Sequence, residues 1–440
     1  MEIKIKPTIK LNGDIRAPPS KSYSHRAFMA SSLADGVSVI KNALVGGDVE
    51  ITIKILKKLG VHISKVSENN YMVKGLGGIF KPCKEVVDIG NSGTSIRIFS
   101  ALALLVEGGL QFTGVFFERK RPIIPLLEAL TKWGGFYNIN AGLLSIKRKK
   151  NKCNNVEIRG DVSSQFITAL LMVGPLILCK KINHLTLNII SPLISYPYIA
   201  ITLKVLKHYG INIQEQINNK RLGKYIIPCQ QNYRAQNFTI PGDFSSVSYI
   251  IAAGVLSFDD SLITISNLDF NSPQGDKRLI EILQDMGAQI EMNKEKGILI
   301  IKGNLRKNPL KGLNINIQDN PDLFPILAVI GVFALGKTSL YNAKSLRYKE
   351  SDRISIMARE LKKMGVNVEE SEDELTIHHC TELKGIEVLH ENDHRIAMAL
   401  TIANLYAMTN SKVERIDIVQ DSYPSFISDL IKLGASIEIV

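Results

Sequence analysis

A short pattern recurs six times along this chain and constrains its fold more than any other feature. Each copy has a leucine, two variable residues, a large apolar residue and a glycine, and apolar alternation usually follows. The copies lie at 56–60, 130–134, 206–210, 283–287, 361–365 and 430–434. Their glycines are 74, 76, 77, 78 and 69 residues apart. A glycine at this place is typical of a helix C-terminus before a strand, so the near-constant spacing indicates internal duplication.

A second series of signals interleaves with the first. Polar turns rich in Gly, Asp, Asn and Ser precede apolar helical runs, 40 to 49 residues ahead of each glycine. They lie near Ser20, Asn91, Asp161, Asp243, Asn320 and Asn392. Such residues cap the first turn of a helix. Each unit of about 75 residues is therefore predicted to hold two helices and several strands.

Six α/β units over 440 residues predict two domains of three units each, because a chain of this length exceeds one simple hydrophobic core. In such a symmetric arrangement several helix N-termini could converge, and their dipoles would favour an anionic ligand. A six-unit clamp on DNA could be built from the same repeats, although a clamp has no use for clustered reactive side chains. Both interpretations stay open at this point.

The overall composition is that of a soluble globular protein, with 45% hydrophobic and 22% charged residues. The alternating start, residues 1–6, is neither a signal peptide nor a transit peptide, and the longest apolar runs (166–179 and 324–336) are too short to span a bilayer. The five cysteines are scattered and form no C-x-x-C pair. We therefore expect no disulfide, no zinc site and no membrane partner, and a cytoplasmic, reducing compartment.

The net charge of +12 is compatible with binding to nucleic acid, with acidic small substrates, or with a merely lysine-rich surface. The densest basic run, 147–150, lies in a polar stretch without interleaved aromatic residues and is interpreted as a solvated surface. Charge by itself does not choose among these partners.

Positive side chains recur at or near the expected helix starts. They are Lys21, Arg26, Arg97, Arg121, Lys349, Arg353 and Arg395. A cation is unfavourable at a helix N-terminus, where the dipole is already positive, so their repeated presence indicates a bound anion with more than one phosphate-like group. The acids Asp322 and Glu350 lie among these cations and would be available for proton transfer.

Ten short motifs, in order along nearly the whole chain, resemble those of the enolpyruvyl transferases, and within that family the branch acting on shikimate 3-phosphate. They are P-S-K-S-Y-S-H-R (19–26), G-N-S-G-T-S-I-R (90–97), R-P-I (121–123), S-S-Q-F (163–166), S-Y-P-Y (195–198), G-D-F-S-S (242–246), P-D (321–322), K-E-S-D-R (349–353), D-H-R-I-A-M (393–398) and S-Y-P-S-F (422–426). Most pieces are unspecific alone, but the ordered set is specific.

This resemblance implies two domains of an inside-out α/β barrel, each with three βαβαββ units. The chain would start in one domain (1–19), build the other (20–240) and return (241–440), with the active site in the cleft between the domains. The implied reaction transfers the enolpyruvyl group of phosphoenolpyruvate to the 5-hydroxyl of shikimate 3-phosphate in aromatic amino-acid biosynthesis. It releases phosphate after a tetrahedral intermediate and needs no cofactor or metal. We expect the protein to be a monomer that binds anionic small-molecule substrates and no nucleic acid. We also expect it to be a target of glyphosate.

The resemblance also implies roles for individual residues. Shikimate 3-phosphate would be bound by Lys21, Ser22, Arg26, Ser163, Ser164, Gln165, Ser195, Tyr198, Asp322 and Lys349. Phosphoenolpyruvate would be bound by Lys21, Gly93, Arg121, Gln165, Arg353 and Arg395. Asp322 would be the general base for the 5-hydroxyl, Glu350 its partner in proton transfer at C3, and Lys21 would assist.

Two positions depart from the family pattern, and one related branch remains as an alternative. Ser345 stands where an asparagine is common, and Gln420 and Asp421 occupy a region where many members have a lysine. One phosphoenolpyruvate contact is therefore in doubt. The alternative branch acts on UDP-N-acetylglucosamine. It is disfavoured by K-S-Y-S-H-R and S-S-Q-F, and by the lack of a cysteine near residue 115.

Overall fold

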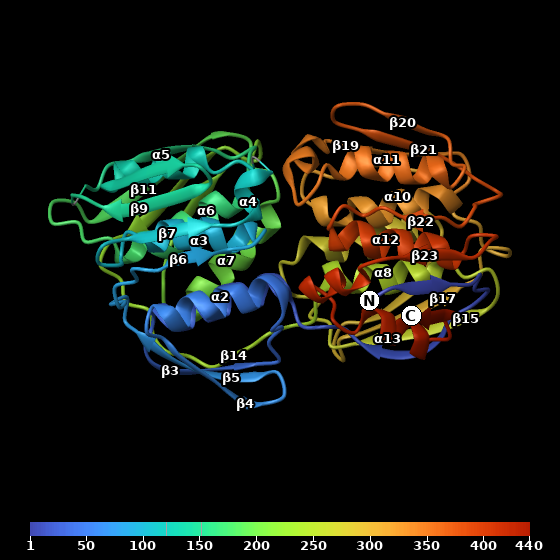
Figure 1. Ribbon diagram of the computed structural model, residues 1–440, viewed down its shortest axis with the longest axis horizontal. Coiled ribbons are helices and arrows are strands. Elements are labelled where there is room, and N and C mark those ends of the chain that lie inside the picture. The colour runs from blue at the N-terminus through green and yellow to red at the C-terminus, as the bar shows by residue number, and fades with distance from the viewer. Residues whose placement is uncertain (120, 151) are drawn as a thin grey trace. The chain divides into compact units, whose positions relative to one another are not determined.

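The computed structural model describes residues 1–119, 121–150 and 152–440 (Figure 1). The chain divides into two compact units. Unit 1 comprises Met1–Ser20 and Pro241–Val440, and unit 2 comprises Lys21–Ile240. Among the helices within these described ranges, none is both long and apolar enough to cross a membrane.

Unit 2 contains three four-stranded sheets in its described part, with the orders β14-β3-β5-β4, β6-β7-β9-β8 and β10-β11-β13-β12. Its strands are β3 (Asp35–Lys41), β4 (His62–Ser67), β5 (Asn70–Leu76), β6 (Val86–Asp88), β7 (Leu110–Thr113), β8 (Gly135–Asn140), β9 (Leu143–Arg148), β10 (Val156–Arg159), β11 (His184–Ser191), β12 (Gln214–Ile217), β13 (Gly223–Pro228) and β14 (Phe238–Thr239). Its helices are α1 (Lys21–Leu33), α2 (Gly47–Lys58), α3 (Gly93–Leu102), α4 (Val115–Glu118), α5 (Ile124–Lys132), α6 (Ser164–Val173), the 3-10 helix η1 (Gly174–Leu176) and α7 (Tyr196–His208).

Unit 1 contains three sheets of the same size, with the orders β16-β17-β15-β2, β18-β19-β21-β20 and β22-β23-β1-β24. Its strands are β1 (Ile3–Ile5), β2 (Asn12–Arg16), β15 (Ser261–Ser266), β16 (Gln289–Asn293), β17 (Ile298–Gly303), β18 (Asn314–Asn316), β19 (Lys337–Tyr341), β20 (Val368–Glu370), β21 (Leu375–His378), β22 (Glu387–Val388), β23 (Ser411–Val413) and β24 (Ile437–Ile439). Its helices are α8 (Phe244–Val255), η2 (Gly275–Lys277), α9 (Arg278–Asp285), η3 (Pro321–Leu323), α10 (Phe324–Phe333), η4 (Lys344–Tyr348), α11 (Arg353–Lys363), α12 (His394–Leu405), η5 (Ile416–Asp421) and α13 (Phe426–Lys432).

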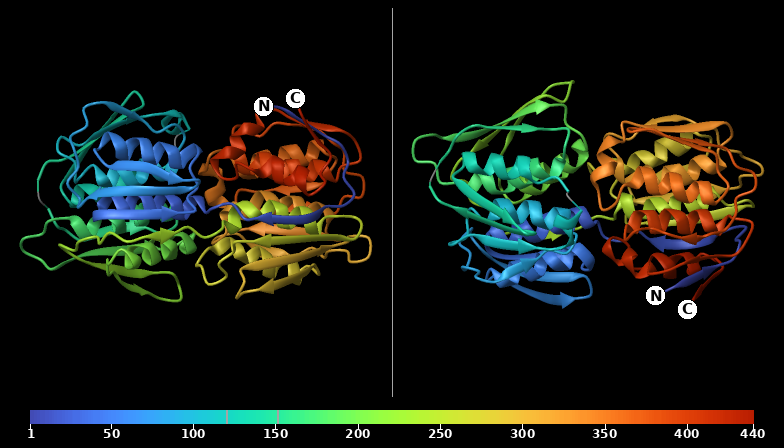
Figure 2. Two further views of the ribbon diagram at one scale, coloured as in Figure 1. Left: turned by 90° about the horizontal axis from the view of Figure 1, so that it is seen from below. Right: turned by 45° about the horizontal axis from the view of Figure 1, so that its top comes forward.

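All six sheets share one pairing pattern, in which one parallel pair is followed by two antiparallel pairs. In one of them β6 pairs with β7 in parallel, and β9 then pairs antiparallel with both β7 and β8. Strands from the chain start complete two sheets of unit 1: β2 pairs with β15, and β1 lies between β23 and β24. Figure 2 shows these blue strands beside yellow and red segments from the C-terminal half.

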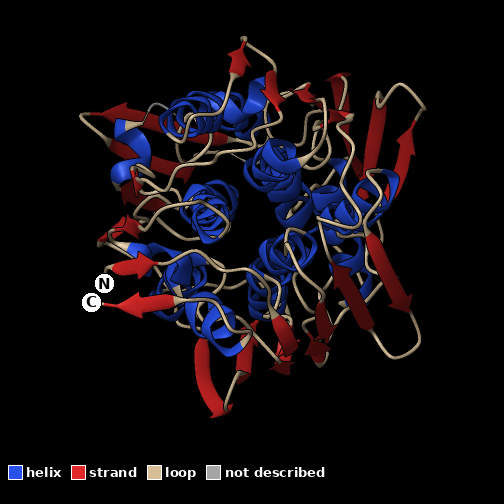
Figure 3. Cartoon of the chain, turned by 90° about the vertical axis from the view of Figure 1, so that its right-hand side faces the viewer, coloured by secondary structure: helices blue, strands red, loops and turns tan. Residues whose placement is uncertain are grey.

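Three helices in each unit are almost wholly buried, namely α1, α3 and α6 in unit 2 and α8, α10 and α12 in unit 1. All ten residues of α10 are buried, as expected for a helix that is apolar on every side. In unit 1, whose N and C ends are marked in Figure 3, the helices lie inside and the strands surround them. The fold is the inside-out α/β barrel that the sequence predicted.

The six recurring glycines each follow the second helix of a repeat, after α2, α5, α7, α9, α11 and α13. Their φ angles lie between 82° and 104°, a left-handed conformation that glycine adopts at little cost. The first helices begin at the polar turns, and Ser92, Ser163, Asp243 and Asp393 each accept a backbone N–H of the helix they cap. The sixfold internal repeat predicted from the sequence is confirmed.

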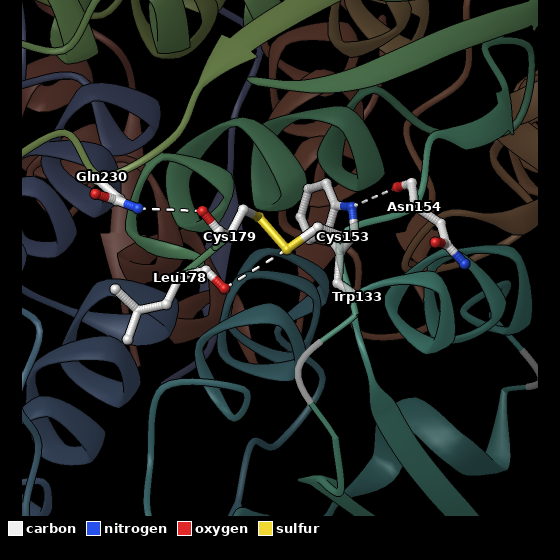
Figure 4. The surroundings of a disulfide bond; sticks show 6 residues. All are labelled: Trp133, Cys153, Asn154, Leu178, Cys179 and Gln230. Atoms are coloured by element: carbon white, nitrogen blue, oxygen red, sulfur yellow. Dashed lines mark hydrogen bonds between the residues drawn. A yellow bond between two sulfur atoms is a disulfide. The ribbon is translucent and has the colours of Figure 1, made fainter. Parts of the chain in front are cut away.

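A disulfide joins Cys153 to Cys179 in unit 2 (Figure 4), with 5.9 Å between their Cα atoms. The expectation of no disulfide is therefore wrong for this pair. The spacing of the two cysteines matches no sequence motif. The pair could not be predicted from the sequence, because it is the folding of β10 and α6 that brings the two segments together. Trp133 Nε1 donates to Asn154 O at 3.2 Å beside one end of the bond. The cysteines consequently no longer support a reducing compartment.

Candidate active site

Arg26 on α1 is the most deeply buried arginine or lysine among the described residues of unit 2, at 3% exposure. Its Nε donates to Thr202 Oγ1 at 2.8 Å, and its Nη2 donates to Thr168 Oγ1 at 3.2 Å and to Tyr198 O at 3.1 Å. Its Nη1 donates to Ser22 O. No carboxylate of the described residues contacts it, and burial lowers its pKa to about 10. A buried cation with only neutral partners is suited to a bound anion.

Two neighbours of Arg26 on α1 tie the helix to α2. Lys21 Nζ lies 2.7 Å from Asp48 Oδ2, in a pair that is mostly buried. His25 Nδ1 lies 2.9 Å from Thr52 Oγ1, and burial lowers the pKa of His25 to about 3. The His25 imidazole is therefore neutral and links two helices, while Lys21 is held by an acid that the sequence analysis did not single out.

A second cluster in unit 2 is formed around the ring of Phe116. The guanidinium carbons of Arg97 and Arg121 lie 5.4 and 5.1 Å from its centroid. Arg97 Nη1 donates to Gln165 Oε1. A Cβ on Gly93 would lie 2.5 Å from Arg121 Nη2, so only glycine fits there without displacing the guanidinium. The structure thus brings Gly93 and Arg121 together with Arg97, which contacts Gln165; their role in binding phosphoenolpyruvate stays a prediction.

The remaining predicted residues of unit 2 lie at the starts of α6 and α7. Ser163 caps α6 and accepts from Gln165 N at 3.3 Å, while Ser164 is buried in the first turn. Ser195 precedes α7 with a φ of 52° and is buried. The carbonyl of Tyr198 joins this helix start to Arg26. The start of α7 therefore lies against the buried guanidinium of unit 2.

Arg353 is the centre of the corresponding group in unit 1, and it is 1% exposed. Its Nη1 lies 2.8 Å from Asp322 Oδ1, its Nη2 lies 2.8 Å from Glu350 Oε2, and its Nε lies 2.9 Å from Asp393 Oδ2. Burial opposes its charge, but these three acids together raise the pKa of Arg353 above its ordinary value. The guanidinium is therefore fixed by three carboxylates from three segments.

Arg395 shares Asp322 with Arg353. Its Nη2 lies 3.0 Å from Asp322 Oδ2, and its Nη1 donates to Ser245 Oγ at 2.6 Å. Each oxygen of Asp322 thus accepts from a different arginine. Lys349, the remaining predicted residue of this unit, is half-buried beside Glu350 in the chain. The two acids expected to transfer protons, Asp322 and Glu350, both contact Arg353, and Asp322 also contacts Arg395; their catalytic role stays a prediction.

Sequence reasoning missed several residues that hold these groups. They are Asp48, Thr168, Thr202 and Ser245, together with the arginine-binding role of Asp393. The only available signal was that Ser245 and Asp393 lie within matched motifs.

At the two departures from the family pattern, Asp421 Oδ2 lies 3.9 Å from His394 Nδ1, and Ser345 is half-buried in η4.

Comparisons with known proteins agree over the whole chain. A family model described as EPSP synthase (3-phosphoshikimate 1-carboxyvinyltransferase) matches residues 5–430. A 3-phosphoshikimate 1-carboxyvinyltransferase of Methanocaldococcus jannaschii is 43% identical, covering 99% of both chains, and one of Methanococcus aeolicus is 40% identical, covering 99% of this chain and 100% of that one.

Solved structures give the same relationship. An EPSP synthase from Acinetobacter baumannii superposes with a TM-score of 0.81 at 25% identity, covering 99% of each chain. The enolpyruvyl transferase NikO from Streptomyces tendae has a TM-score of 0.78 at 18% identity, covering 99% of this chain and 98% of that one, and supports the fold alone.

Proposed function

The chain belongs to the EPSP synthase (3-phosphoshikimate 1-carboxyvinyltransferase) family, and on this premise we propose how its residues divide the reaction between them. The protein is a transferase of the shikimate pathway, which moves the enolpyruvyl group of phosphoenolpyruvate to shikimate 3-phosphate. The proposal concerns the route and the residues. The 5-hydroxyl oxygen bonds to C2 of phosphoenolpyruvate while C3 gains a proton, and loss of phosphate from C2 with a proton from C3 then restores the double bond.

Asp322 is the general base that accepts the hydroxyl proton, and Glu350 supplies and later removes the proton at C3. The supporting observation is that both acids contact Arg353, while Asp322 also contacts Arg395. Arginines suit the carboxylate and phosphate of phosphoenolpyruvate because they bind such oxygens in pairs. An arriving substrate anion would compete for these guanidiniums, and this would release a carboxylate oxygen to act as a base.

Both units supply anion-binding groups, and most of those for shikimate 3-phosphate come from unit 2. Arg26 binds the phosphate of shikimate 3-phosphate together with Ser22, Ser163, Ser164, Gln165, Ser195 and Tyr198, and Lys349 of unit 1 adds a further cation. Phosphoenolpyruvate is bound by Lys21, Gly93, Arg121 and Gln165 of unit 2 and by Arg353 and Arg395 of unit 1. This division is supported by Arg26, whose described partners are all neutral oxygens. That the two groups act in one interdomain cleft stays a prediction.

The route balances in atoms and charge without a metal or redox cofactor, because the bond from C2 to the 5-hydroxyl oxygen replaces the bond from C2 to phosphate and only protons move besides. The positive net charge serves the anionic substrates, and the enzyme acts as a monomer in the cytoplasm. Light scattering of the purified protein tests whether it is a monomer. Filter binding of DNA across salt concentrations tests for nucleic-acid affinity, which would fall steeply with added salt if it existed.

Phosphate release from phosphoenolpyruvate tests the reaction. We expect release only when shikimate 3-phosphate is present, and none with UDP-N-acetylglucosamine as the acceptor. Release that ignores the shikimate ester, or that requires the nucleotide sugar, would reject the assignment.

A further inference from the structure

Asp276 is a buried carboxylic acid of unit 1 to which the reaction above gives no role. It lies in η2, between β15 and α9, and is 4% exposed. Its Oδ1 has no hydrogen-bond partner among the described residues. The carboxyl group lies close to the hydroxyl of Ser245, which favours its ionised form and lowers its pKa against the effect of burial. A buried carboxyl oxygen without a donor is costly, so this position needs an explanation.

Ser245 connects Asp276 to the arginine that faces Asp322. Because an arginine can only donate, Ser245 Oγ accepts from Arg395 Nη1 at 2.6 Å. The hydroxyl proton of Ser245 is then not used by Arg395 and can turn toward the nearby carboxyl group of Asp276. Arg395 Nη2 lies 3.0 Å from Asp322 Oδ2. Asp276, the hydroxyl of Ser245 and the guanidinium of Arg395 therefore form one cluster.

The charges around Asp276 are mostly negative. Asp243, which caps α8, acts on it together with Asp322 from η3 and Arg395 from α12, and the hydroxyl of Ser245 lies close by. Burial, and then the charge of Asp322, raise the pKa of Asp276 to about 7, against the attraction of Arg395.

Two cations next to Asp276 in the chain turn away from it. Lys277 Nζ donates to the carbonyls of Phe270 and Ser272, and Arg278 Nη1 donates to Asn316 O. Arg353 is occupied by three other acids. Arg395 is thus the cation that faces Asp276.

We propose that Asp276 is a positioning residue for phosphoenolpyruvate: through Ser245 it aims the guanidinium of Arg395, and it takes up a proton when the substrate's negative charge arrives there. This rests on the proposed function, in which Arg395 binds phosphoenolpyruvate. A new anion near Arg395 weakens the attraction that stabilises ionised Asp276, so the pKa of Asp276 rises and its protonated form is favoured. By linkage, phosphoenolpyruvate then binds more weakly as the pH rises above the range in which free Asp276 ionises.

The test compares the wild type with Asp276→Asn, a neutral mimic of the protonated acid. The KM for phosphoenolpyruvate of the wild type should rise about fivefold to tenfold between about pH 7 and pH 9. In Asp276→Asn this rise should disappear, while kcat and the KM for shikimate 3-phosphate change far less. Asp259→Asn, at an exposed pair with Arg306, is the matched control and should keep the wild-type profile. A wild-type profile in Asp276→Asn would overturn the proposal.

A second variant keeps the proposal testable if Asp276→Asn does not fold. Ser245→Ala cuts the link but leaves the acid, and it should raise the KM for phosphoenolpyruvate about tenfold at about pH 7, with kcat changed far less. An unchanged KM would overturn the positioning role. Wild-type enzyme that releases no phosphate with both substrates present would instead reject the proposed function itself.

Discussion

Arg353 Nη1 lies 2.8 Å from Asp322 Oδ1 in a buried contact that holds the acid at a fixed place beside two guanidiniums. Because Arg395 contacts the other oxygen, the carboxylate is oriented from both sides before any substrate is present. Such preorganisation is what a base needs if it is to reach one particular hydroxyl. The relationship leads directly to the first prediction.

Replacing Asp322 with alanine should abolish turnover but not substrate binding. We expect kcat to fall by about two to four orders of magnitude, because general base catalysis contributes that much. Both KM values should change far less. The matched control is Asp285→Ala, at the exposed end of α9, which should retain wild-type turnover. Near-normal kcat in Asp322→Ala would remove this residue from the base role.

Replacing Arg26 with methionine should separate binding from stability. The folded protein buries this cation among neutral oxygens, and burial lowers its pKa to about 10, so its charge adds no stability at neutral pH. We expect an unfolding temperature at least as high as that of the wild type, and a KM for shikimate 3-phosphate raised at least about a hundredfold. Differential scanning fluorimetry measures the unfolding temperature, and steady-state kinetics measures the KM for the ester.

The control for that experiment is Arg306→Met, at an exposed pair in unit 1, which should leave both quantities unchanged. A markedly lower unfolding temperature in Arg26→Met, with the KM for the ester unchanged, would show a structural role instead.

Replacing Gly93 with alanine should weaken phosphoenolpyruvate binding selectively. The added methyl would lie 2.5 Å from Arg121 Nη2 and 3.2 Å from Arg97 Nη1, so at least the first guanidinium must move. We expect the KM for phosphoenolpyruvate to rise about tenfold or more, with the KM for shikimate 3-phosphate nearly constant. Steady-state kinetics decides the matter. Equal changes in both constants would point to a general distortion of α3.

Features that depend on neighbouring residues could be predicted from the sequence, whereas contacts between residues far apart in the chain could not. Gly60 and its five counterparts mark helix ends that depend on neighbouring residues alone, so the repeats and the helix starts could be predicted. Arg353 was identified as a cation at a helix start, but its contact with Asp393 spans 40 residues. No local pattern encodes such a contact. Asp276 and the disulfide partner of Cys153 were missed for the same reason, since only the folded chain reveals them.

Thiol counting should detect the disulfide in unit 2. Cys83, Cys229 and Cys380 are free and Cys153 is bonded to Cys179, so three thiols should react in the denatured, unreduced protein and five after reduction. Cys153→Ser should lower the free energy of unfolding by about 3 kcal/mol, since the bond closes a loop of 26 residues. Five reactive thiols without a reductant would show that the bond does not form in the isolated protein.

Acid should destabilise the protein partly through His25. Its pKa falls from 6.5 in the unfolded chain to about 3 in the folded protein because of burial, so protons bind preferentially to the unfolded state. The resulting stability is complete above about pH 6.5 and is lost at up to about 1.4 kcal/mol per pH unit as the pH falls toward 3. His25→Gln should flatten the pH dependence of denaturant unfolding over this range by that slope. The exposed His62→Gln serves as the control, and an equal slope in wild type and His25→Gln would contradict the neutral, buried imidazole.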